Sequence, residues 1–562
     1  MRESKVRSAR SDRTRAPAAA AVACAVSAAV SSAAALQPAA DVLRIGRTPE
    51  GRPVEVVAVG DPGRDANGLT RDQRPAVLVV AGVHGHHVIG SEVARAVADD
   101  AAERYEDLLG ERTLYVLPVA NPEGRARYQA ADGPKIEAGR APQRLDFDGD
   151  GRSNEDGPDD LNGDGLITMM RVPVPSEAAS AYGLEATHLI DPDEPRLMIE
   201  PTPGKTGPAT HAVLIEGLDR DGDGAFNEDG WGGASGGGID LDRNFPTHWP
   251  ELQDGAGRYP LERPEARLLA DWMLSRPNIQ LVLVFGPHDT LGEVPEAGRY
   301  GPAGEVPTGL EPGDRPHHEA IAEAFREITG VTGGGFGDRS GSLVQWAYSE
   351  FGVLSASTPV WYRPDLVDAD NAAAAGSPDE GWLAYVDDRL GGDGFVAWTE
   401  VEHPQLGTVE VGGFAPGVRV NPDPSLDGVR ERLNREQTDV VGALLERLPM
   451  LEVAEPTVRR VGPSLYRISI EARNTGRLPS VTAIGQKNRR LHPLIMVLDP
   501  EQTLPRDALL DDGRVRRVGS IPANGGTRAE WLVKAKAGTS LGLEVRSRRF
   551  GPRSFTIRLE DN

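Results

Sequence analysis

The chain has 562 residues and a formal net charge of −24, so it is longer than one hydrophobic core usually supports and too acidic to favour nucleic acid or anionic membranes as partners. Its composition, 39% hydrophobic and 26% charged with 66 Gly and 45 Pro, is that of a soluble globular protein rich in turns, and it argues against a helical bundle. The single cysteine, Cys24, excludes a disulfide framework and thiolate metal ligands.

Residues 1–36 have the pattern of a secretory signal peptide. A basic start is followed by the uncharged stretch "APAAAAVACAVSAAVSSAAAL" (16–36), in which Ala33 and Ala35 form an A-x-A arrangement. A single membrane anchor and a lipoprotein modified at Cys24 are the alternatives, but alanine is weakly hydrophobic and "AVAC" is a poor lipobox. We therefore expect a secreted or periplasmic protein with no membrane span after removal of the signal.

Residues 41–450 alternate between apolar runs and helical patterns. The predicted strands are 54–60, 75–83, 113–120 and 279–286, and the predicted helices are 90–109, 263–275, 315–329 and 426–448. Short runs of Val, Leu and Ile bounded by Gly or Pro are typical of strands buried on both faces. The pattern predicts an α/β fold with a mixed, largely parallel sheet flanked by helices.

Three Asp-rich segments interrupt this domain, within the inserts 146–171 and 219–230. They read "DFDGDGRSNEDG" (146–157), "DLNGDGLITMMR" (160–171) and "DRDGDGAFNEDG" (219–230). Acidic or amide side chains at positions 1, 3 and 5 with Gly at 6 suit a hard cation, which makes calcium the predicted ion. The predicted ligands are Asp146, Asp148, Asp150, Asp160, Asn162, Asp164, Asp219, Asp221 and Asp223. No segment has Glu at position 12 and no amphipathic helices flank them, so they are not EF-hands; a solvated acidic insertion is the alternative.

From residue 451 the sequence changes to short alternating segments such as "RAEWLVKA", separated by Gly, Pro and Asn turns. This pattern predicts a β-sandwich module over 451–562.

The stretch "AGVHGHHVIGSE" (81–92) places histidines directly after a predicted strand, and His288 follows the strand 279–286. Side chains at the carboxyl ends of strands in an α/β sheet commonly form a site. We expect His86 to be exposed, the His317–His318 pair to lie on a helix surface, and "HPQLG" (403–407) to be a structural turn.

Several ordered segments resemble the zinc carboxypeptidases of the carboxypeptidase A type. They are "HGHH" (84–87), "LPVANPEG" (117–124), "GIDLDRNFP" (238–246) and "FGPHDT" (285–290), and the resemblance extends over about 45–450. It implies removal of C-terminal residues from peptides with Zn²⁺ held by His84, His87 and His288. It further implies that Asp240 orients His84, that Arg243 with Asp242 binds the substrate carboxylate, and that Arg171 polarises the scissile carbonyl.

The chain departs from the family pattern at the site. His87 stands where the family has a ligand Glu, Asp242 where it has an Asn, and Val360 where it has the catalytic Glu, while Phe336 takes the place of a Tyr. Glu92, Glu350 and Glu400 are the other carboxylates considered as a base, and Glu400 is the one assigned to catalysis. Two hypotheses follow: a zinc metallocarboxypeptidase of reduced activity, or an inactive pseudo-peptidase that binds peptides or surface material outside the cell.

Overall fold

The computed structural model describes residues 40–130, 135–136, 157–220, 222, 224, 226–227, 238–253, 255–301, 304, 306–331, 337–363, 377–422, 428–490, 494–510 and 513–560. The predicted signal peptide and nearly all of the first Asp-rich segment lie outside these residues. No helix within the described ranges combines the length and the apolar character needed to cross a membrane.

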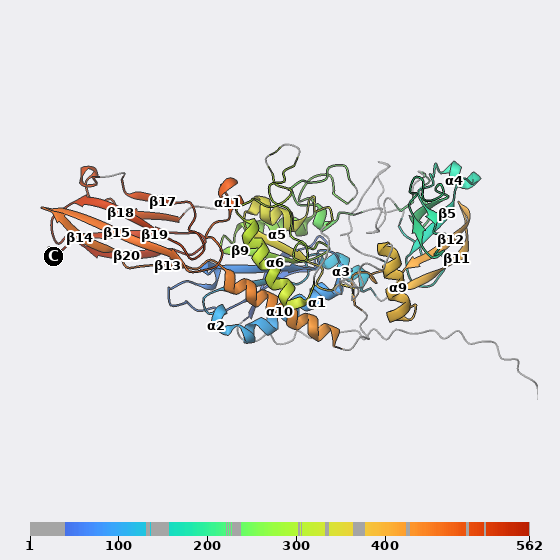
Figure 1. Cartoon of the computed structure of the whole chain (residues 1–562), viewed down its shortest axis with the longest axis horizontal. Coiled ribbons are helices and arrows are strands. Elements are labelled where there is room, and N and C mark those ends of the chain that lie inside the picture. The colour runs from blue at the N-terminus through green and yellow to red at the C-terminus, as the bar shows by residue number, and fades with distance from the viewer. Residues whose placement is uncertain are drawn as a thin grey trace, which may run out of the picture. The chain divides into compact units, whose positions relative to one another are not determined.

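A six-stranded sheet forms the centre of the first domain (Figure 1). Its order is β1 (Ala40–Arg47), β2 (Pro53–Val59), β4 (Thr113–Leu117), β3 (Ala76–Ala81), β9 (Ile279–Phe285) and β10 (Leu354–Thr358). The pairs β3–β4, β3–β9 and β9–β10 are parallel, whereas β1–β2 and β2–β4 are antiparallel. The sheet is therefore mixed and largely parallel, as predicted.

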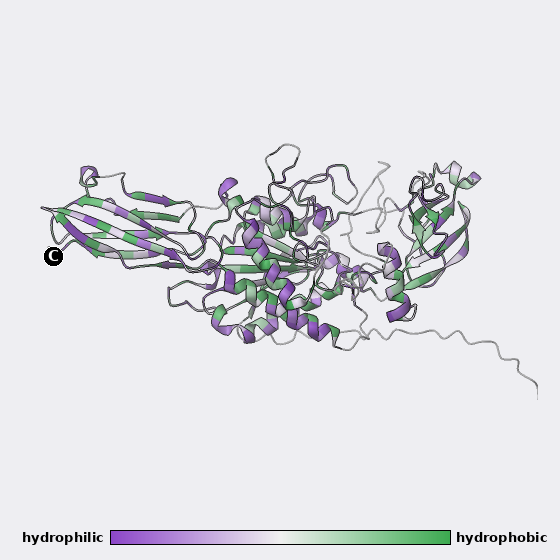
Figure 2. Cartoon of the chain, in the orientation of Figure 1, coloured by the Kyte–Doolittle hydropathy of each residue, from purple (hydrophilic) through white to green (hydrophobic). Residues whose placement is uncertain are grey.

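Helices cover both faces of this sheet. Alternate residues of β3 separate into two cores: Val77 and Val79 pack with α1 (Val88–Arg104), α6 (Arg315–Thr329) and α10 (Val429–Arg447), while Leu78 and Val80 pack with α5 (Pro264–Leu274) and α7 (Leu343–Trp346). Burial on both faces explains why these strands are apolar without alternation, and Figure 2 shows them hydrophobic along their length.

A second, four-stranded sheet was not predicted. Its order is β11 (Phe395–His403), β12 (Gly407–Phe414), β5 (Met169–Pro173) and β8 (His211–Ile215), and all its pairs are antiparallel. The short elements β6 (Leu189–Ile190), β7 (Met198–Ile199) and α4 (Glu177–Ala181) lie in the same stretch of chain, and α9 (Pro378–Leu390) precedes β11. The predicted turn at 403–407 is the β11–β12 connection, where the ring of His403 is buried and Nε2 contacts the Gly217 carbonyl at 2.9 Å.

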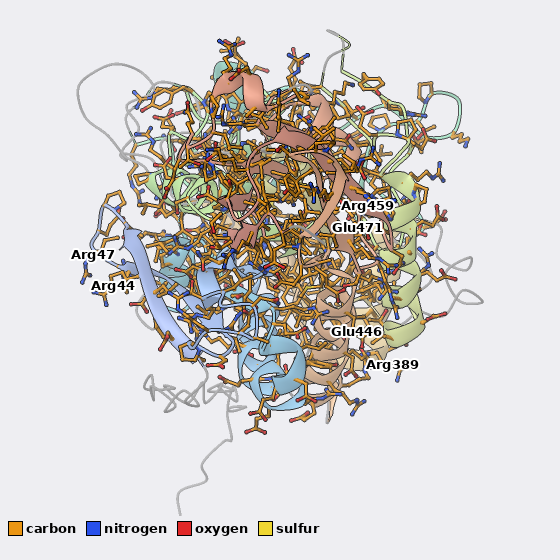
Figure 3. All side chains as sticks on the ribbon, turned by 90° about the vertical axis from the view of Figure 1, so that its left-hand side faces the viewer. Arg44, Arg47, Arg389, Glu446, Arg459 and Glu471 are labelled. Carbon is orange, nitrogen blue, oxygen red and sulfur yellow. The ribbon has the colours of Figure 1, made fainter. Side chains whose placement is uncertain are left out.

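The last part of the chain forms two antiparallel sheets that share one core. The first contains β13 (Leu451–Val453), β14 (Thr457–Gly462), β15 (Leu465–Asn474) and β18 (Gly526–Lys534); the second contains β17 (Val515–Val518), β16 (Leu494–Leu498), β19 (Ser540–Arg546) and β20 (Arg553–Arg558). Trp531 and Tyr466 from the first sheet and Met496 and Leu543 from the second belong to the same buried cluster, as a β-sandwich requires. Charged side chains such as Arg459 and Glu471, labelled in Figure 3, are exposed on the surface of this module.

The remaining elements are short: η1 (Arg71–Gln73), α2 (Glu106–Leu109), α3 (Pro122–Tyr128), η2 (Leu241–Arg243), the π-helical turn η3 (Ala347–Phe351), α11 (Ala483–Lys487) and η4 (Arg506–Ala508). Two predictions about histidines were wrong, because His86 is partly buried rather than exposed and His318 is buried. His318 is not on the surface, because α6 turns this side chain into the core, where it is 1% exposed.

Candidate active site

The parallel pairing of β3 with β9 brings two histidines to the same edge of the sheet. Ala81 at the end of β3 is in register with Phe285 at the end of β9, and His84 and His288 each follow three residues later. Both side chains therefore project from the carboxyl end of the central strands, where α/β folds commonly carry their sites.

Two aspartates on one 3₁₀ turn face these histidines. Nε2 of His84 lies 2.9 Å from Oδ1 of Asp240, and Nε2 of His288 lies 3.2 Å from Oδ2 of Asp242. Asp240 also accepts a 2.8 Å hydrogen bond from the Asp242 amide, which fixes the turn η2. An imidazole that donates one N–H to a carboxylate is oriented and made more basic, as second-sphere partners of metal ligands usually do. The metal role of Asp240 and of the two histidines stays a prediction.

Asp242 is buried rather than turned to solvent. It is 2% exposed, its Oδ1 accepts a 2.8 Å hydrogen bond from the Leu343 amide, and its Oδ2 faces His288. The carboxylate that replaces the family's amide therefore has an imidazole and a helix N-terminus as neighbours. These contacts do not favour the predicted place of Asp242 beside a bound carboxylate.

His87 is buried at the start of α1, in contact with Pro359 and Gly90. It is 5% exposed, its Nε2 lies 3.0 Å from the carbonyl oxygen of Pro359, and a Cβ added at Gly90 would approach its ring to 2.6 Å. Burial, followed by the neighbouring His86 and His84, lowers the pKa of His87 to about 3, so the ring is neutral. Because a carbonyl oxygen only accepts, Nε2 carries the proton and Nδ1 the lone pair. Nδ1 is buried without a hydrogen-bond partner in the described structure.

The loop between β3 and α1 packs closely against α3 because a glycine, Gly85, stands at the contact. A Cβ at Gly85 would lie 2.1 Å from the carbonyl carbon of Gly124, so only glycine permits this approach. Asn121, which caps α3, is fully buried and accepts a 2.9 Å hydrogen bond from the Gly124 amide. The segments "HGHH" and "NPEG", far apart in sequence, thus form one packed unit.

The donor chemistry of the three histidines suits zinc. In each, Nε2 faces an oxygen acceptor, so Nδ1 would be the coordinating atom, and in His87 that atom is buried and has no hydrogen-bond partner among the described residues. Across the described ranges, however, no three His, Cys, Asp or Glu side chains are grouped closely enough to hold a metal ion. The residue types are those that bind zinc, but within the described residues the three histidines are not close enough together to coordinate one ion.

No carboxylate occupies the end of β10 beside His87. The residue there is Pro359, which presents its carbonyl oxygen, while the side chain of Val360 is 2% exposed and belongs to the core under α1, α6 and α10. Val360 adopts φ 70, and its amide is bound by the Thr358 hydroxyl at 3.1 Å. The end of β10 thus presents a backbone carbonyl oxygen to the site and no titratable side chain.

Arg243 lies at the end of η2, next to these groups. Its Nη2 donates to Gln253 at 2.7 Å, its Nη1 lies 3.9 Å from Asp338, and its buried Nε has no hydrogen-bond partner within the described structure. The predicted substrate-binding arginine is therefore beside the histidines, 27% exposed.

Arg171 and Glu400 belong to the four-stranded sheet and not to this group. Arg171 binds both carboxylate oxygens of Glu410, at 2.8 and 3.0 Å, and stacks on Trp398 at 4.5 Å, while Glu400 pairs with Glu410 across β11 and β12. The other two carboxylates considered as a base are engaged as well. Glu92 forms ion pairs with Arg125 and Arg430, and Glu350 accepts a hydrogen bond from Thr247.

In the described parts of the Asp-rich loops, acidic side chains accept hydrogen bonds from backbone amides. Asp160 accepts from the amides of Gly163, Asp164 and Gly165, Asn162 and Asp164 contact each other, and Asp219 accepts from Gly222 and Gly224. The predicted ligands Asp146, Asp148, Asp150, Asp221 and Asp223 lie outside the described residues. Calcium binding gains no support from these contacts and stays a prediction.

Sequence reasoning missed Pro359, Asp338 and Asn421. Asn421 accepts hydrogen bonds from the Val88 and Ile89 amides at 2.9 and 3.0 Å and donates one to the His86 carbonyl at 2.9 Å. It lies more than 300 residues from the loop that it holds, and no sequence pattern marks such a contact.

Two parts of the chain match known protein families. Residues 28–162 match the family "Zinc carboxypeptidase", and residues 450–558 match a "Domain of unknown function (DUF8731)". No curated protein matches the chain.

Three solved structures illustrate the likeness. The carboxypeptidase A of Helicoverpa armigera is 12% identical, with 63% of this chain and 70% of that chain covered and a TM-score of 0.31. A metallo-carboxypeptidase of Burkholderia cenocepacia is 14% identical, with 72% and 65% covered and a TM-score of 0.31. Bovine thrombin-activatable fibrinolysis inhibitor is 11% identical, with 73% and 90% covered and a TM-score of 0.30. The chain thus spans just under two thirds of the Burkholderia protein, and likenesses of this size say nothing of activity. Residues 28–162 are thus similar in sequence to the zinc carboxypeptidase family, and the two histidines after β3 and β9 lie within or next to the part of the sheet that this stretch begins.

Proposed function

We propose that this protein binds the C-terminal residues of peptides at the edge formed by His84, Arg243 and His288, and that it does so without hydrolysing them. The observation that carries this proposal is the end of β10, where Pro359 offers a carbonyl oxygen and Val360 is packed in the core. Neither group can take a proton from water, and loss of a general base costs about 10²–10⁴-fold in rate.

Arg243 supports recognition of a carboxylate. A guanidinium binds a carboxylate through two parallel N–H donors, and among the described residues Nε has no partner here and Nη1 has only the 3.9 Å contact with Asp338. Since 57% of the Asp338 side chain is exposed, a ligand carboxylate could take its place at little cost.

Zinc belongs to this proposal, with His84, His87 and His288 as its ligands. Bound zinc acts as a Lewis acid toward a carbonyl oxygen. The Nδ1 of His87, which has no hydrogen-bond partner in the described part of the chain, supports a third imidazole ligand in place of the family's carboxylate. Calcium in the Asp-rich loops, and secretion or transfer to the periplasm through residues 1–36, are proposed on the sequence patterns alone.

The second candidate function is zinc-dependent removal of C-terminal residues. The contact between His84 and Asp240 favours it, because a carboxylate that orients a ligand histidine is expected in a working metal site. Both candidate functions act on the C-termini of peptides, and they differ in whether the peptide is hydrolysed.

Calorimetry with N-acetylated peptides tests the proposal. A peptide with a free C-terminus should bind, its C-terminal amide should bind at least about tenfold more weakly, and Arg243→Gln should remove the difference. Arg258→Gln serves as the matched control, because Arg258 is exposed and pairs with Glu262 instead. Zinc content and peptide turnover are measured on the same samples. One equivalent of zinc without turnover agrees with the proposal, whereas EDTA-sensitive turnover would decide for the hydrolase.

A further inference from the structure

The net charge of the chain is distributed unevenly along its length. Residues 451–562 contain 20 Lys and Arg and 12 Asp and Glu, which gives the sandwich module a formal charge of +8, whereas residues 1–450 carry −32. A basic module joined to an acidic domain can attract an anionic partner that the acidic domain would repel. The basic side chains that face solvent on the module are therefore candidates for contact with such a partner.

On the outer face of the first sheet of the sandwich, the charges at one end are balanced. Glu452 of β13 stands opposite Arg473 of β15, and Glu471 of β15 stands opposite Arg528 of β18. The guanidinium of Arg528 lies 3.7 Å from Glu471 and 2.9 Å from Glu530. Opposite charges that face each other across two strands stabilise a sheet.

The other end of the same face departs from this rule. Arg459 of β14 stands directly opposite Arg467 of β15, and like charges in this position destabilise a sheet. Lys534 of β18 is opposite Leu465, one outward-facing position closer to the turn between β14 and β15. The three cations, which we call the basic row, are exposed on three neighbouring strands. None of them forms an ion pair or a side-chain hydrogen bond with another described residue.

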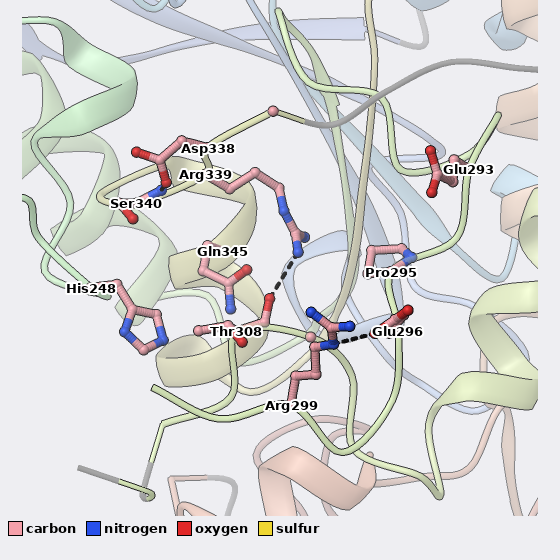
Figure 4. A pocket seen from close by; sticks show the side chains of 12 residues that line it. His248, Glu293, Pro295, Glu296, Arg299, Thr308, Asp338, Arg339, Ser340 and Gln345 are labelled. Atoms are coloured by element: carbon pink, nitrogen blue, oxygen red, sulfur yellow. Dashed lines mark hydrogen bonds and ion pairs between the residues drawn. The ribbon is translucent and has the colours of Figure 1, made fainter. Parts of the chain in front are cut away.

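The arginines of the pocket near the candidate site differ from the basic row because they have partners within the protein. Arg299 forms an ion pair with Glu296, and Nη2 of Arg339 donates a 2.8 Å hydrogen bond to the Thr308 carbonyl (Figure 4). In the basic row the repulsion between two arginines is left uncompensated by the described residues. An anion bound from outside would remove that repulsion.

We propose that the basic row binds an anionic polysaccharide, a chain whose sugar units carry carboxylate or sulfate groups. A guanidinium binds such groups through parallel N–H donors. Neighbouring strands lie about 4.8 Å apart, so an extended polymer with anionic groups at short intervals can contact all three strands at once. The proposed secretion would bring the module into contact with such polymers.

The composition of this face favours a polysaccharide over a nucleic acid or a membrane. None of the described outward-facing residues of the sheet is aromatic, whereas proteins that bind single-stranded nucleic acid stack the bases on aromatic rings. Among the described residues of β13, β14, β15 and β18, only Val461 is a large hydrophobic side chain that is exposed, at 40%. One valine gives a membrane little apolar surface to bury.

The test measures binding of the full-length protein to heparin and to polygalacturonate at low ionic strength, with neutral dextran as the uncharged probe. At least one of the two anionic polymers should bind and dextran should not, and added salt should weaken binding because it screens exposed charges. The double variant Arg459→Gln/Arg467→Gln should bind about tenfold more weakly. The matched control is Arg517→Gln/Arg558→Gln, which removes the same charge from exposed positions of β17 and β20 in the second sheet and should bind like the unaltered protein.

Absence of binding to both anionic polymers, or an equal loss of affinity in the two double variants, would overturn the proposal. Tighter binding to single-stranded DNA or to phosphatidylglycerol vesicles in the same buffer would overturn the choice of a polysaccharide. The unfolding temperature of each variant is measured without ligand. Replacing two arginines that repel each other should not lower it, and a decrease would show that contacts within the protein hold the pair and would overturn its assignment as a binding surface. No readout involves a peptide, so polysaccharide binding and peptide recognition can fail separately.

Discussion

Each of the three imidazoles at the candidate site has its Nε2 turned toward an oxygen atom, although only two of them follow sheet strands directly. Nε2 of His84 and of His288 faces a carboxylate, and Nε2 of His87 faces the Pro359 carbonyl. A carbonyl oxygen carries no net charge, so it orients His87 without raising its basicity as a carboxylate would. Burial, followed by the neighbouring His86, keeps the pKa of His87 low and its ring neutral, so a zinc ion held by three histidines would keep its full charge of +2 where the family's carboxylate would reduce it.

His318 gives the chain a dependence of stability on pH that does not involve the site histidines. Burial, with Arg339 as the next cause, lowers the pKa of His318 from 6.5 to about 4. Between these values the unfolded chain binds a proton that the native state does not, so the free energy of unfolding falls as the pH drops from 6.5 to 4. A shift of this size corresponds to about 3 kcal/mol. Urea unfolding at pH 7 and pH 4.5 measures it.

The non-titrating variant His318→Gln should lose less stability between the two pH values, whatever its stability at pH 7. His317→Gln, at the neighbouring and more exposed position, should keep the slope of the unaltered protein. An identical slope in all three proteins would assign the acid sensitivity to other groups.

At the scale of elements, Asn421 links the loop after β12 to the first turn of α1. Its carboxamide satisfies the Val88 and Ile89 amides, which a helix start leaves without intrahelical partners, and it also binds the His86 carbonyl. Asn421→Ala should lower the free energy of unfolding by about 1–2 kcal/mol. Asn421→Asp keeps the acceptor for the two amides and loses the donor to His86, so it should cost less. Denaturant unfolding of the two variants checks this order, and equal losses would show that the amide contacts contribute little.

The elements that sequence patterns predicted share one property: they are buried on both faces or strongly amphipathic. The runs at 75–83 and 279–286 became β3 and β9 because every residue of both strands is buried. The four-stranded sheet escaped prediction because its strands are short or partly exposed and come from segments more than 150 residues apart. The same distinction applies to the residues of the candidate site. Positions next to the strand ends, such as His84 and His288, could be found, whereas Asn421 and the carbonyl of Pro359 reach the site through tertiary contacts alone.

For the whole molecule, the matched domain that begins at residue 450 has a core of its own but also packs into a core of the first domain. Leu478 and Ile484, which lie within 450–558, are buried in the same cluster as α1, α6 and α10 of the first domain. Asp314, at the start of α6, is fully buried and accepts hydrogen bonds from the Ala483 and Ile484 amides at 2.7 and 3.0 Å, so it caps α11 across the boundary. Arg549 is buried as well, and it donates to Gln280 of β9 and to the Ser480 carbonyl.

Removal of residues 450–562 should therefore destabilise the zinc carboxypeptidase-like domain rather than release it intact. Leu478 and Ile484 alone account for about 1.5–3 kcal/mol each of apolar burial, and their loss would leave that part of the core open to water. The expected result for the shortened chain is a lower unfolding temperature, aggregation, or no folded product. Asp314→Asn in the full-length chain is the milder variant, since it weakens the cap on α11 and keeps the apolar contacts, and it should give a smaller decrease in the same measurement. A shortened chain that unfolds cooperatively at the temperature of the full-length protein would mean that the sandwich is a detachable module after all, and that the cross-boundary contacts stabilise only the sandwich.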